Sequence, residues 1–485
     1  MEELCKVTIN YGTNKKDYNL KKGGTILNLK LENKILIGSE AYEIEGFYYD
    51  IDYENEYNLN LALNNDLILY AKLTYNDTSI INSTSKEEIV KKLDLYIKNL
   101  IDKTANSSRP YIPSWNQEGF KGRWNYIDGV FLNSLVALYN ETGNTYYKDA
   151  MLNYINYYID QDGNFINPET KEIGYREGEL DSVCESKILF DVYEYTDDKR
   201  YLKAIENTYN SLEAVPKALG TINYSHKTSY PNQIWLDGMY MYVPFLARYA
   251  HLKQNKQIFD DIKIQYEYIR NHVFDEKLGL YYHGHDTSKS VFWCDKQTGN
   301  SKSVWLRSTG WFIVSLTDVL EYYPEGENKK YLNALLDEAL VGILKYKDEK
   351  TNMFYQLPDK GPTAYLVKEE YFLGLGNKKY SKDAIIKNYL ESSGSSMIAY
   401  SLMKSATLGY IDLKYKAEGI KIFEGIYNYS FKNNALNNIC ITAGLGPQSK
   451  PIRDGSPAYY LAEPVGSNDA KGVGPFLMAF IEYSK

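Results

Sequence analysis

The sequence predicts a mainly α fold, a closed toroid of six helical hairpins preceded by a small β-rich N-terminal domain. Residues 1–83 alternate apolar and polar side chains with period two, whereas residues 84–485 repeat a pattern of helix, short polar turn and helix. A chain of 485 residues exceeds the size at which one simple core stops growing. We therefore expect two domains, a β-rich one over 1–83 and a helical one over 84–485.

The N-terminal segment predicts half-buried antiparallel strands. Alternation is clear in "CKVTINYG", "TILNLKLEN", "YEIEGFYYDIDYE" and "LNLALNNDLILYAKLTYN", with Gly and Asn turns between them. The stretch "NDTSIINSTSKEE" at 76–88 is polar and ends in a helix-start pattern, so we interpret it as the linker between the domains.

The remainder repeats an apolar helix, a short polar turn and a second helix. Copies include "ALYNETGNTYYKDAMLNYINYYI", "DVYEYTDDKRYLKAIENTYNSL" and "DVLEYYPEGENKKYLNALLDEAL", the pattern of antiparallel helix pairs. Helices are expected near 86–103, 125–141, 145–159, 180–196, 199–213, 235–253, 257–273, 304–323, 328–347, 391–408, 411–428 and 471–484.

The even-numbered helices are predicted to form an inner ring. They begin with Gly, Ser and aromatic residues, which allow close approach, while the odd-numbered ones carry the charged stripes of an outer surface. In a closed ring the inner helix starts would surround one depression. Their unpaired N–H groups would favour an anion there. An open solenoid is the structural alternative.

Composition excludes several classes of protein. A net charge of -8 argues against a general nucleic-acid or anionic-membrane surface. No apolar run approaches membrane-spanning length, and "MEELCKVTIN" lacks the pattern of a secretion signal. Four scattered cysteines show neither metal spacing nor a disulfide rhythm, so we expect a reduced, cytoplasmic protein.

Two carboxylates stand at predicted inner-helix starts. Asp237 lies in "QIWLDGMY" and Asp181 in "GELDSV", one helical hairpin apart. Either could be an ordinary N-cap. Alternatively, both lie on one rim beside apolar residues that separate their pKa values, as acid–base chemistry on sugars requires. We interpret Asp237 and Asp181 as candidate catalytic residues.

Other candidates gather at the same starts and in the loops before them. Arg307 lies between Trp305 and Trp311 in "VWLRSTGW"; it is either a stem packed between rings or a planar carboxylate clamp. The loop histidines and "HGHD" do not make a metal set, because further ligands are lacking. The expected substrate-binding residues here are Arg307, Trp305, Trp311, and Trp124 and Tyr126 of "GRWNYIDG", and at least one of the loop histidines should donate a hydrogen bond to the ligand.

The order of these blocks resembles glycoside hydrolase family 105, the unsaturated rhamnogalacturonyl hydrolases. "ELDSVCES", "SHKTSYPNQ", "IWLDGMYMYVPFLARY", "GLYYHGHD", "VWLRSTGW" and "NDAKGVGPFLMA" carry the resemblance over roughly residues 86–485. The resemblance implies an (α/α)6 barrel, with the acid/base on Asp237 and a second Asp at Asp181. It also implies substrate-contacting histidines at His226 and His283 and a carboxylate-binding arginine at Arg307. His285 and Tyr242 depart from residues common in the family, which bears on the shape of the pocket.

The resemblance implies removal of a 4,5-unsaturated uronic acid from the non-reducing end of lyase-generated oligosaccharides, without a metal or other cofactor. The partner would be an unsaturated uronate-containing oligosaccharide, such as unsaturated rhamnogalacturonan disaccharide. The alternatives are an unsaturated glucuronyl hydrolase acting on glycosaminoglycan fragments, a sugar epimerase, and a non-catalytic carbohydrate-binding barrel.

Overall fold

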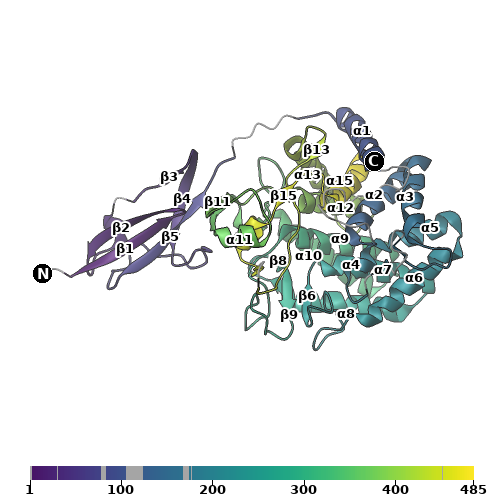
Figure 1. The fold of residues 1–485 in the computed structure, drawn as a ribbon, viewed down its shortest axis with the longest axis horizontal. Coiled ribbons are helices and arrows are strands. Elements are labelled where there is room, and N and C mark those ends of the chain that lie inside the picture. The colour runs from purple at the N-terminus through teal and green to yellow at the C-terminus, as the bar shows by residue number, and fades with distance from the viewer. Residues whose placement is uncertain are drawn as a thin grey trace. The chain divides into compact units, whose positions relative to one another are not determined.

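The computed structural model describes residues 3–29, 31–77, 83–104, 124–167, 174–175, 177–449 and 452–485. They form two compact units (Figure 1). The first contains Met1–Ile80, Tyr355–Leu390 and Thr442–Pro464, and the second contains Ile81–Phe354, Glu391–Ile441 and Val465–Lys485. The small unit thus includes two later segments in addition to the N-terminal region.

A mixed sheet is the centre of the first unit. Its strands are β1 (Leu4–Tyr11), β2 (Asn14–Lys21), β3 (Lys34–Ile37), β4 (Glu40–Tyr48), β5 (Leu67–Thr74), β10 (Thr363–Val367) and β11 (Ala384–Lys387). Five strands are hydrogen-bonded neighbours in the order β11-β10-β5-β1-β2, and β4 pairs with both β3 and β5. Alternate residues of β1, including Val7 and Ile9, are fully buried in its core. Two short helices, α11 (Glu369–Gly374) and α14 (Pro457–Ala462), belong to the same unit.

The β-rich N-terminal region is confirmed, with three corrections. The predicted strand at 25–33 is wrong: Ile26–Asn28 forms a 3₁₀ turn. Two edge strands were missed: β2, whose side chains are mostly exposed and carry charge, and β3, which among the described strands pairs only with β4. Finally, β1 and β5 pair in parallel, so the sheet is not wholly antiparallel.

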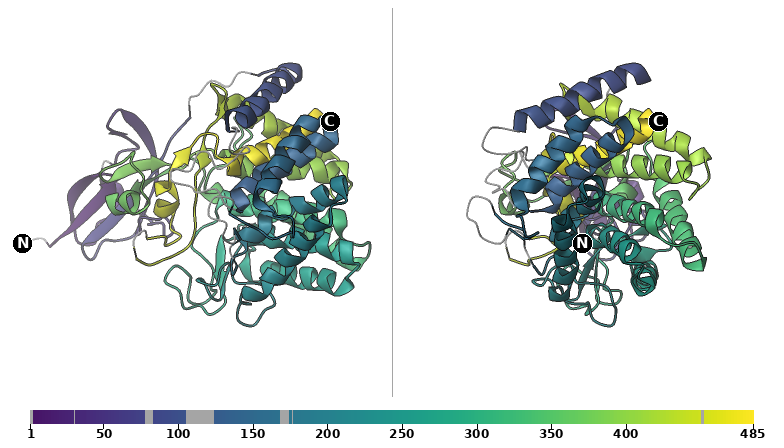
Figure 2. Two further views of the ribbon diagram at one scale, coloured as in Figure 1. Left: turned by 45° about the vertical axis from the view of Figure 1, so that its right-hand side comes forward. Right: turned by 90° about the vertical axis from the view of Figure 1, so that its right-hand side faces the viewer.

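The second unit is mainly helical, as predicted. Its longer elements are α1 (Lys86–Thr104), α2 (Tyr126–Thr142), α3 (Thr145–Tyr158), α4 (Asp181–Glu185), α5 (Ile188–Thr196), α6 (Lys199–Ser211), α7 (Gly238–Lys253), α8 (Lys256–Val273), α9 (Leu306–Tyr322), α10 (Glu327–Leu344), α12 (Ser392–Thr407), α13 (Lys414–Ser430) and α15 (Ala470–Ser484). Figure 2 shows these helices from two further directions. None of the described helices is both long and apolar enough to span a bilayer.

Contacts between helices follow a cyclic order. Helix α2 packs on α4, α4 on α7, α7 on α9, α9 on α12, α12 on α15, and α15 on α2 again. A second helix packs on most of these, for example α3 on α2 and α8 on α7. All members of the cycle start at the predicted inner-helix starts. Charges at the starts of α4, α7, α9 and α15 all act on Tyr126 at the start of α2, so these five starts lie near one another.

One predicted helix is divided. The segment expected at 180–196 is α4 followed by α5, with a turn at Ser186 and Lys187. Ser186 Oγ accepts hydrogen bonds from Trp124 Nε1 at 3.2 Å and from Thr208 Oγ1 at 2.9 Å. The break therefore lies at a buried residue held by two other elements, which periodicity alone does not reveal.

Close approach of α9 and α12 depends on glycine. A Cβ on Gly394 would lie 2.5 Å from Leu306 Cγ and 2.9 Å from the Leu306 carbonyl oxygen. A Cβ on Gly310 would lie 2.7 Å from Met397 Sδ. The Gly- and Ser-rich starts thus serve the close packing that the sequence predicted.

Gly394→Ala is expected to destabilise the protein by about 1–3 kcal/mol, the usual cost of overpacking a tight contact. Denaturant unfolding measures the change. Gly466→Ala is the matched control, because its Cβ would meet only the flexible Ile441 side chain, and we expect a smaller loss. Equal midpoints for Gly394→Ala and the unaltered protein would contradict this account of the α9–α12 contact.

Candidate active site

Asp237 directly precedes α7, but it does not cap that helix. It occupies the N-cap position, yet its side chain accepts no capping hydrogen bond. Instead Asp237 Oδ1 lies 3.3 Å from His283 Nε2. Short strands β6 (Gln233–Trp235) and β9 (Gly284–Asp286) pair beside them, and Leu236 N donates to the His283 carbonyl at 2.8 Å. The pairing of these strands therefore presents the imidazole to the carboxylate.

The electrostatic surroundings keep Asp237 ionised. Burial raises the pKa of its carboxyl group. The nearby imidazole of His283 and the charge of His226 outweigh burial, so the pKa lies below its ordinary value. Asp237 is thus an acceptor in the free protein and needs a proton from solution before it can act as an acid.

Asp181, the first residue of α4, is joined to the segment that leads to Asp237. Its Oδ2 lies 2.8 Å from Lys227 Nζ, and its Oδ1 lies 3.6 Å from His226 Nε2. Lys227 also lies 3.4 Å from Glu179 Oε2. Burial lowers the pKa of His226, while the charges of Asp181 and Asp237 oppose it. The charges of Asp181 and Asp237 therefore both act on His226.

Aromatic rings hold the two histidines. The His226 ring stacks on Trp235 with centroids 4.3 Å apart and an interplanar angle of 14°, and Tyr230 stacks on the same indole at 5.2 Å. His283 meets Trp235 edge-on at 5.7 Å and Trp305 at 4.7 Å. Trp305 thus contacts a site residue, and Trp235 orders both imidazoles.

Arg307 is buried at the start of α9. It is 1% exposed, and its Nη2 donates to the Cys440 carbonyl oxygen. Its Cζ lies 5.1 Å from the centre of the Trp305 ring. Burial lowers the pKa of Arg307, but Cys440 and Glu391 raise it, and the net value is above the ordinary one. Among the described residues nothing accepts a hydrogen bond from its buried Nη1, so this N–H remains for a ligand.

Tyr126, the first residue of α2, lies within the electrostatic reach of the whole cluster. Burial raises the pKa of its phenol well above the ordinary value. The charges of Asp181, Asp469 and Asp237 raise it further, and Arg307 opposes them. Tyr126 is therefore a neutral hydroxyl at neutral pH, placed among the charges of the site.

The sequence reasoning missed a buried ion pair at the start of α15. Lys471 Nζ lies 2.9 Å from Asp469 Oδ1, and the two side chains are 2% and 1% exposed. Burial lowers the pKa of Lys471, Asp469 opposes this, and Arg307 lowers it further. Lys471 is thus close to Arg307. A lysine inside the otherwise apolar "AKGVGPF" was the available signal.

Lys227 and Trp235 were missed as well. Both lie in blocks that the sequence singled out, "SHKTSYPNQ" and "QIWLDG", but neither was assigned a role. The carboxylate partners of Lys227 come from a segment nearly fifty positions earlier in the chain. Spacing along the sequence does not show such a pair.

Two predicted substrate-binding residues are held by protein partners. Trp124 is 1% exposed, donates from Nε1 to Ser186, and its ring lies 4.9 Å from that of Phe165. Trp311 stacks on Tyr240 at 4.2 Å and 13°. These contacts do not involve Asp237, Asp181 or Arg307.

His285 and Tyr242, the two residues that depart from the family pattern, also bond to residues outside the candidate site. His285 Nδ1 lies 2.8 Å from Asn300 Oδ1, and burial lowers the pKa of this histidine. The Tyr242 hydroxyl donates to Gln265 Oε1. Within the described ranges, no group of three or more His, Cys, Asp or Glu side chains is arranged to hold a metal ion.

Comparison with known proteins defines the class. The family model of Glycosyl Hydrolase Family 88 matches residues 86–369 and 378–485. The chain therefore belongs to the glycoside hydrolases of this family. A solved structure of a family 105 glycoside hydrolase from C. acetobutylicum ATCC 824 is 32% identical, covers 81% of this chain and 98% of its own, and superposes with a TM-score of 0.68. The resemblance to family 105 is confirmed.

Two further similarities are more distant. "Protein Atu3128" of Agrobacterium fabrum is 29% identical over 251 residues, which are 50% of this chain and 97% of that protein. The crystal structure of an unsaturated glucuronyl hydrolase specific for heparin is 14% identical, covers 82% of this chain and 98% of its own, and has a TM-score of 0.54. At that identity the latter supports the fold alone.

Proposed function

We propose that the protein removes a 4,5-unsaturated uronic acid from the non-reducing end of lyase-generated oligosaccharides, with unsaturated rhamnogalacturonan disaccharide as the preferred substrate. The observation that carries the proposal is the buried Arg307 with an unused N–H, in one cluster with the Asp237–His283 pair. A guanidinium suits a carboxylate. The cyclic order of helix contacts supports an (α/α)6 barrel around this site.

The proposed reaction hydrates the C4=C5 double bond, which is part of a vinyl ether. A proton from Asp237 adds to C4, and positive charge develops on C5 and the ring oxygen. Water then adds at C5 and returns a proton to Asp237. The resulting hemiketal opens by breaking the bond between C5 and the ring oxygen, which gives a ketone at C5 and a hemiacetal at C1. That hemiacetal breaks down to an aldehyde and releases the second sugar as an alcohol, so atoms and charge balance without attack at the anomeric carbon. This scheme lies outside the usual two-carboxylate mechanism.

The surrounding residues have roles that fit these steps. Asp181, fixed by Lys227, orients the sugar or the attacking water. Arg307 holds the uronate, with Lys471 nearby. His283 positions Asp237. Acid–base help is worth roughly 10²–10⁴-fold, so orientation of the bound substrate supplies much of the remaining acceleration.

The depressed pKa of Asp237 predicts the pH dependence. Because kcat/KM reports the free enzyme, it should rise about tenfold per pH unit as the pH falls from about 7 to about 5, following the protonated fraction of Asp237. Initial rates at low substrate concentration measure this. A flat profile over that range would contradict the assignment of Asp237 as the acid.

Titration of Asp237 itself does not change the stability over this range, and thermal unfolding at each pH controls for the buried His226 and His285, whose lowered pKa values weaken the fold as the pH falls. A carboxyl whose folded pKa is depressed contributes stability above its unfolded pKa of about 3.9, and loses it only as the pH falls through the folded value. The folded pKa of Asp237 is below the ordinary one. Between about pH 7 and pH 5 its contribution to the free energy of unfolding is constant.

The substrate is tested by following the ultraviolet absorbance of the unsaturated uronate. We expect loss of absorbance with a disaccharide whose second sugar is rhamnose and not with one whose second sugar is a hexosamine. The reverse result would favour an unsaturated glucuronyl hydrolase. Sugar binding with no loss of absorbance from either would favour a non-catalytic barrel.

We propose a cytoplasmic location for the protein. Its cysteines Cys5, Cys184, Cys294 and Cys440 are all buried free thiols, which suits a reducing compartment.

A further inference from the structure

A cavity lies in the helical unit, lined by none of the candidate catalytic residues. Its volume is about 160 Å³, and α2, α5, α7, α9, α12 and α15 all contribute to its lining. On α7 the lining begins three residues after Asp237, at Tyr240, and continues to Arg248. On α9 it begins four residues after Arg307, at Trp311. The cavity therefore lies toward the C-terminal ends of these helices.

A stacked pair of rings lines the cavity at its most N-terminal positions on α7 and α9. Tyr240 and Trp311 lie with centroids 4.2 Å apart and planes 13° apart. Lys187 Nζ covers the Tyr240 ring at 3.1 Å and donates to the Tyr240 carbonyl at 3.3 Å. One helical turn, about 5.4 Å, leads from the catalytic end of α7 or α9 to this pair. The lining of the cavity includes none of Asp181, Asp237 and Arg307, so the cavity is a site of its own.

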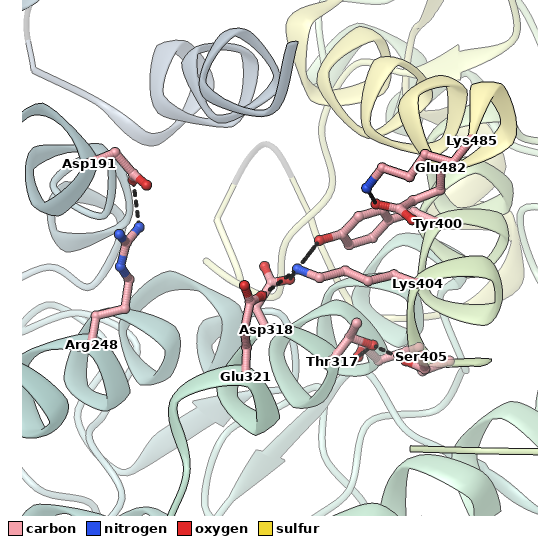
Figure 3. Close-up of polar contacts among 11 residues, drawn as sticks. Asp191, Arg248, Thr317, Asp318, Glu321, Tyr400, Lys404, Ser405, Glu482 and Lys485 are labelled. Carbon is pink, nitrogen blue, oxygen red and sulfur yellow. Dashed lines mark hydrogen bonds and ion pairs between the residues drawn. The ribbon is translucent and has the colours of Figure 1, made fainter. Parts of the chain in front are cut away.

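One wall carries the ion pair of Arg248 and Asp191, 2.6 Å apart (Figure 3). Arg248 Nη1 also donates to the Lys187 carbonyl, and its Cζ lies 5.0 Å from the ring centres of both Phe190 and Tyr322. Its buried Nε has no hydrogen-bond partner among the described residues. Asp191 Oδ1 likewise accepts no hydrogen bond within the described chain, whereas Oδ2 accepts from Arg248.

The opposite wall is organised by Lys404. Its Nζ lies 2.8 Å from Glu321 Oε2, 3.3 Å from Asp318 Oδ1 and 2.8 Å from the Tyr400 hydroxyl, so its three donors are used (Figure 3). The Tyr400 hydroxyl donates to the same Asp318 Oδ1 at 2.8 Å. In the part of the chain that is described, Asp318 Oδ2 and Glu321 Oε1 take no hydrogen bond.

Among the described residues, the cavity offers both an unused N–H donor and unused carboxylate acceptors, and its positive and negative side chains are equal in number. The cations Lys187, Arg248 and Lys404 equal in number the carboxylates Asp191, Asp318 and Glu321. A charged ligand would leave a net charge in a half-buried cavity, which is costly. Hydroxyl groups both donate and accept, so they match carboxylate oxygens that alternate with Arg248 N–H groups. Apolar lining from Pro244, Val314 and Met478 suits the C–H groups of a sugar.

We propose that this cavity binds a neutral monosaccharide or sugar alcohol, as a site separate from the one that binds the unsaturated substrate. The inference does not depend on which reaction the candidate active site performs.

Calorimetric titration of the full-length Arg307→Met variant, whose candidate active site should no longer hold a uronate, with glucose, galactose, rhamnose and xylitol tests the proposal, with galacturonate and glucosamine as charged comparisons. At least one neutral compound should bind, and bind more tightly than both charged ones. Ala137 lines the cavity, so Ala137→Phe should fill it and weaken binding by at least about tenfold. Tyr400→Phe, which removes one hydroxyl, should weaken binding several-fold if Ala137→Phe does not fold.

Trp305→Ala, at the candidate active site, is the matched control and should leave this binding unchanged. Loss of binding in Trp305→Ala with retention in both cavity variants would place the sugar in the active site and overturn the proposal. Preference for galacturonate or glucosamine would overturn the choice of a neutral ligand. Absence of binding by all four neutral compounds at millimolar concentrations would overturn the site itself.

Discussion

Replacement of Asp237 with asparagine is expected to lower kcat on the unsaturated substrate by roughly 10²–10⁴-fold. The amide cannot deliver a proton to C4 or accept one from water. The loss should not come from misfolding, because the Asp237 side chain makes no capping hydrogen bond to α7. Enoate absorbance measures turnover, and thermal unfolding measures the fold.

The chain offers a control with the same chemical change. Asp198 is the true N-cap of α6, and its side chain accepts from Arg200 N at 3.0 Å. Asparagine caps as well as aspartate does, so Asp198→Asn should retain both stability and turnover. Activity in Asp237→Asn within a few-fold of that of Asp198→Asn would exclude Asp237 as the acid.

Replacement of Arg307 with methionine is expected to remove recognition of the uronate. Methionine preserves much of the stem that packs beside Trp305, but supplies no N–H. Losing one partner of a buried charge pair costs about 2–5 kcal/mol, or roughly 30-fold to several thousand-fold in kcat/KM. The loss should fall mainly on KM, and calorimetry should show the same loss for binding of a saturated uronate.

Arg307→Lys tests whether the positive charge of Arg307 alone, without the planar guanidinium, is enough to hold the uronate. A lysine keeps the positive charge but lacks the planar fork, so an intermediate affinity is expected. Thermal unfolding of both variants controls for the lost hydrogen bond to the Cys440 carbonyl. An unchanged affinity for the uronate in a folded Arg307→Met protein would show that the guanidinium is a packing element.

Most helices could be predicted because their signals are local. Asn144, Asp198 and Asn255 cap α3, α6 and α8, as such residues do at helix starts. The apolar periodicity between caps and turns then sets each helix to within a few residues. The division between α4 and α5 could not be predicted, since it is tied to Ser186 contacts with Trp124 and Thr208.

The site was partly predictable for the same reason. Asp237, Asp181 and Arg307 lie at helix starts, and the unusual residue types at these starts can be recognised in the sequence. Neither the Lys227 bond to Asp181 nor the Lys471 bond to Asp469 was foreseen. The sequence indicates which side chains can lie in a site. The bonding partner of each side chain depends on which helix ends come together in the fold.

By itself the sequence determined the helical unit, the β-rich N-terminal region and the chemistry available at the helix starts, because caps, periodicity and residue type act over a few positions. Only the tertiary structure decided that Asp237 faces His283 rather than capping its helix, and that β10 joins the N-terminal strands at β5. Both depend on contacts between residues far apart in the chain, whose free energy comes from burial and pairing in the folded state.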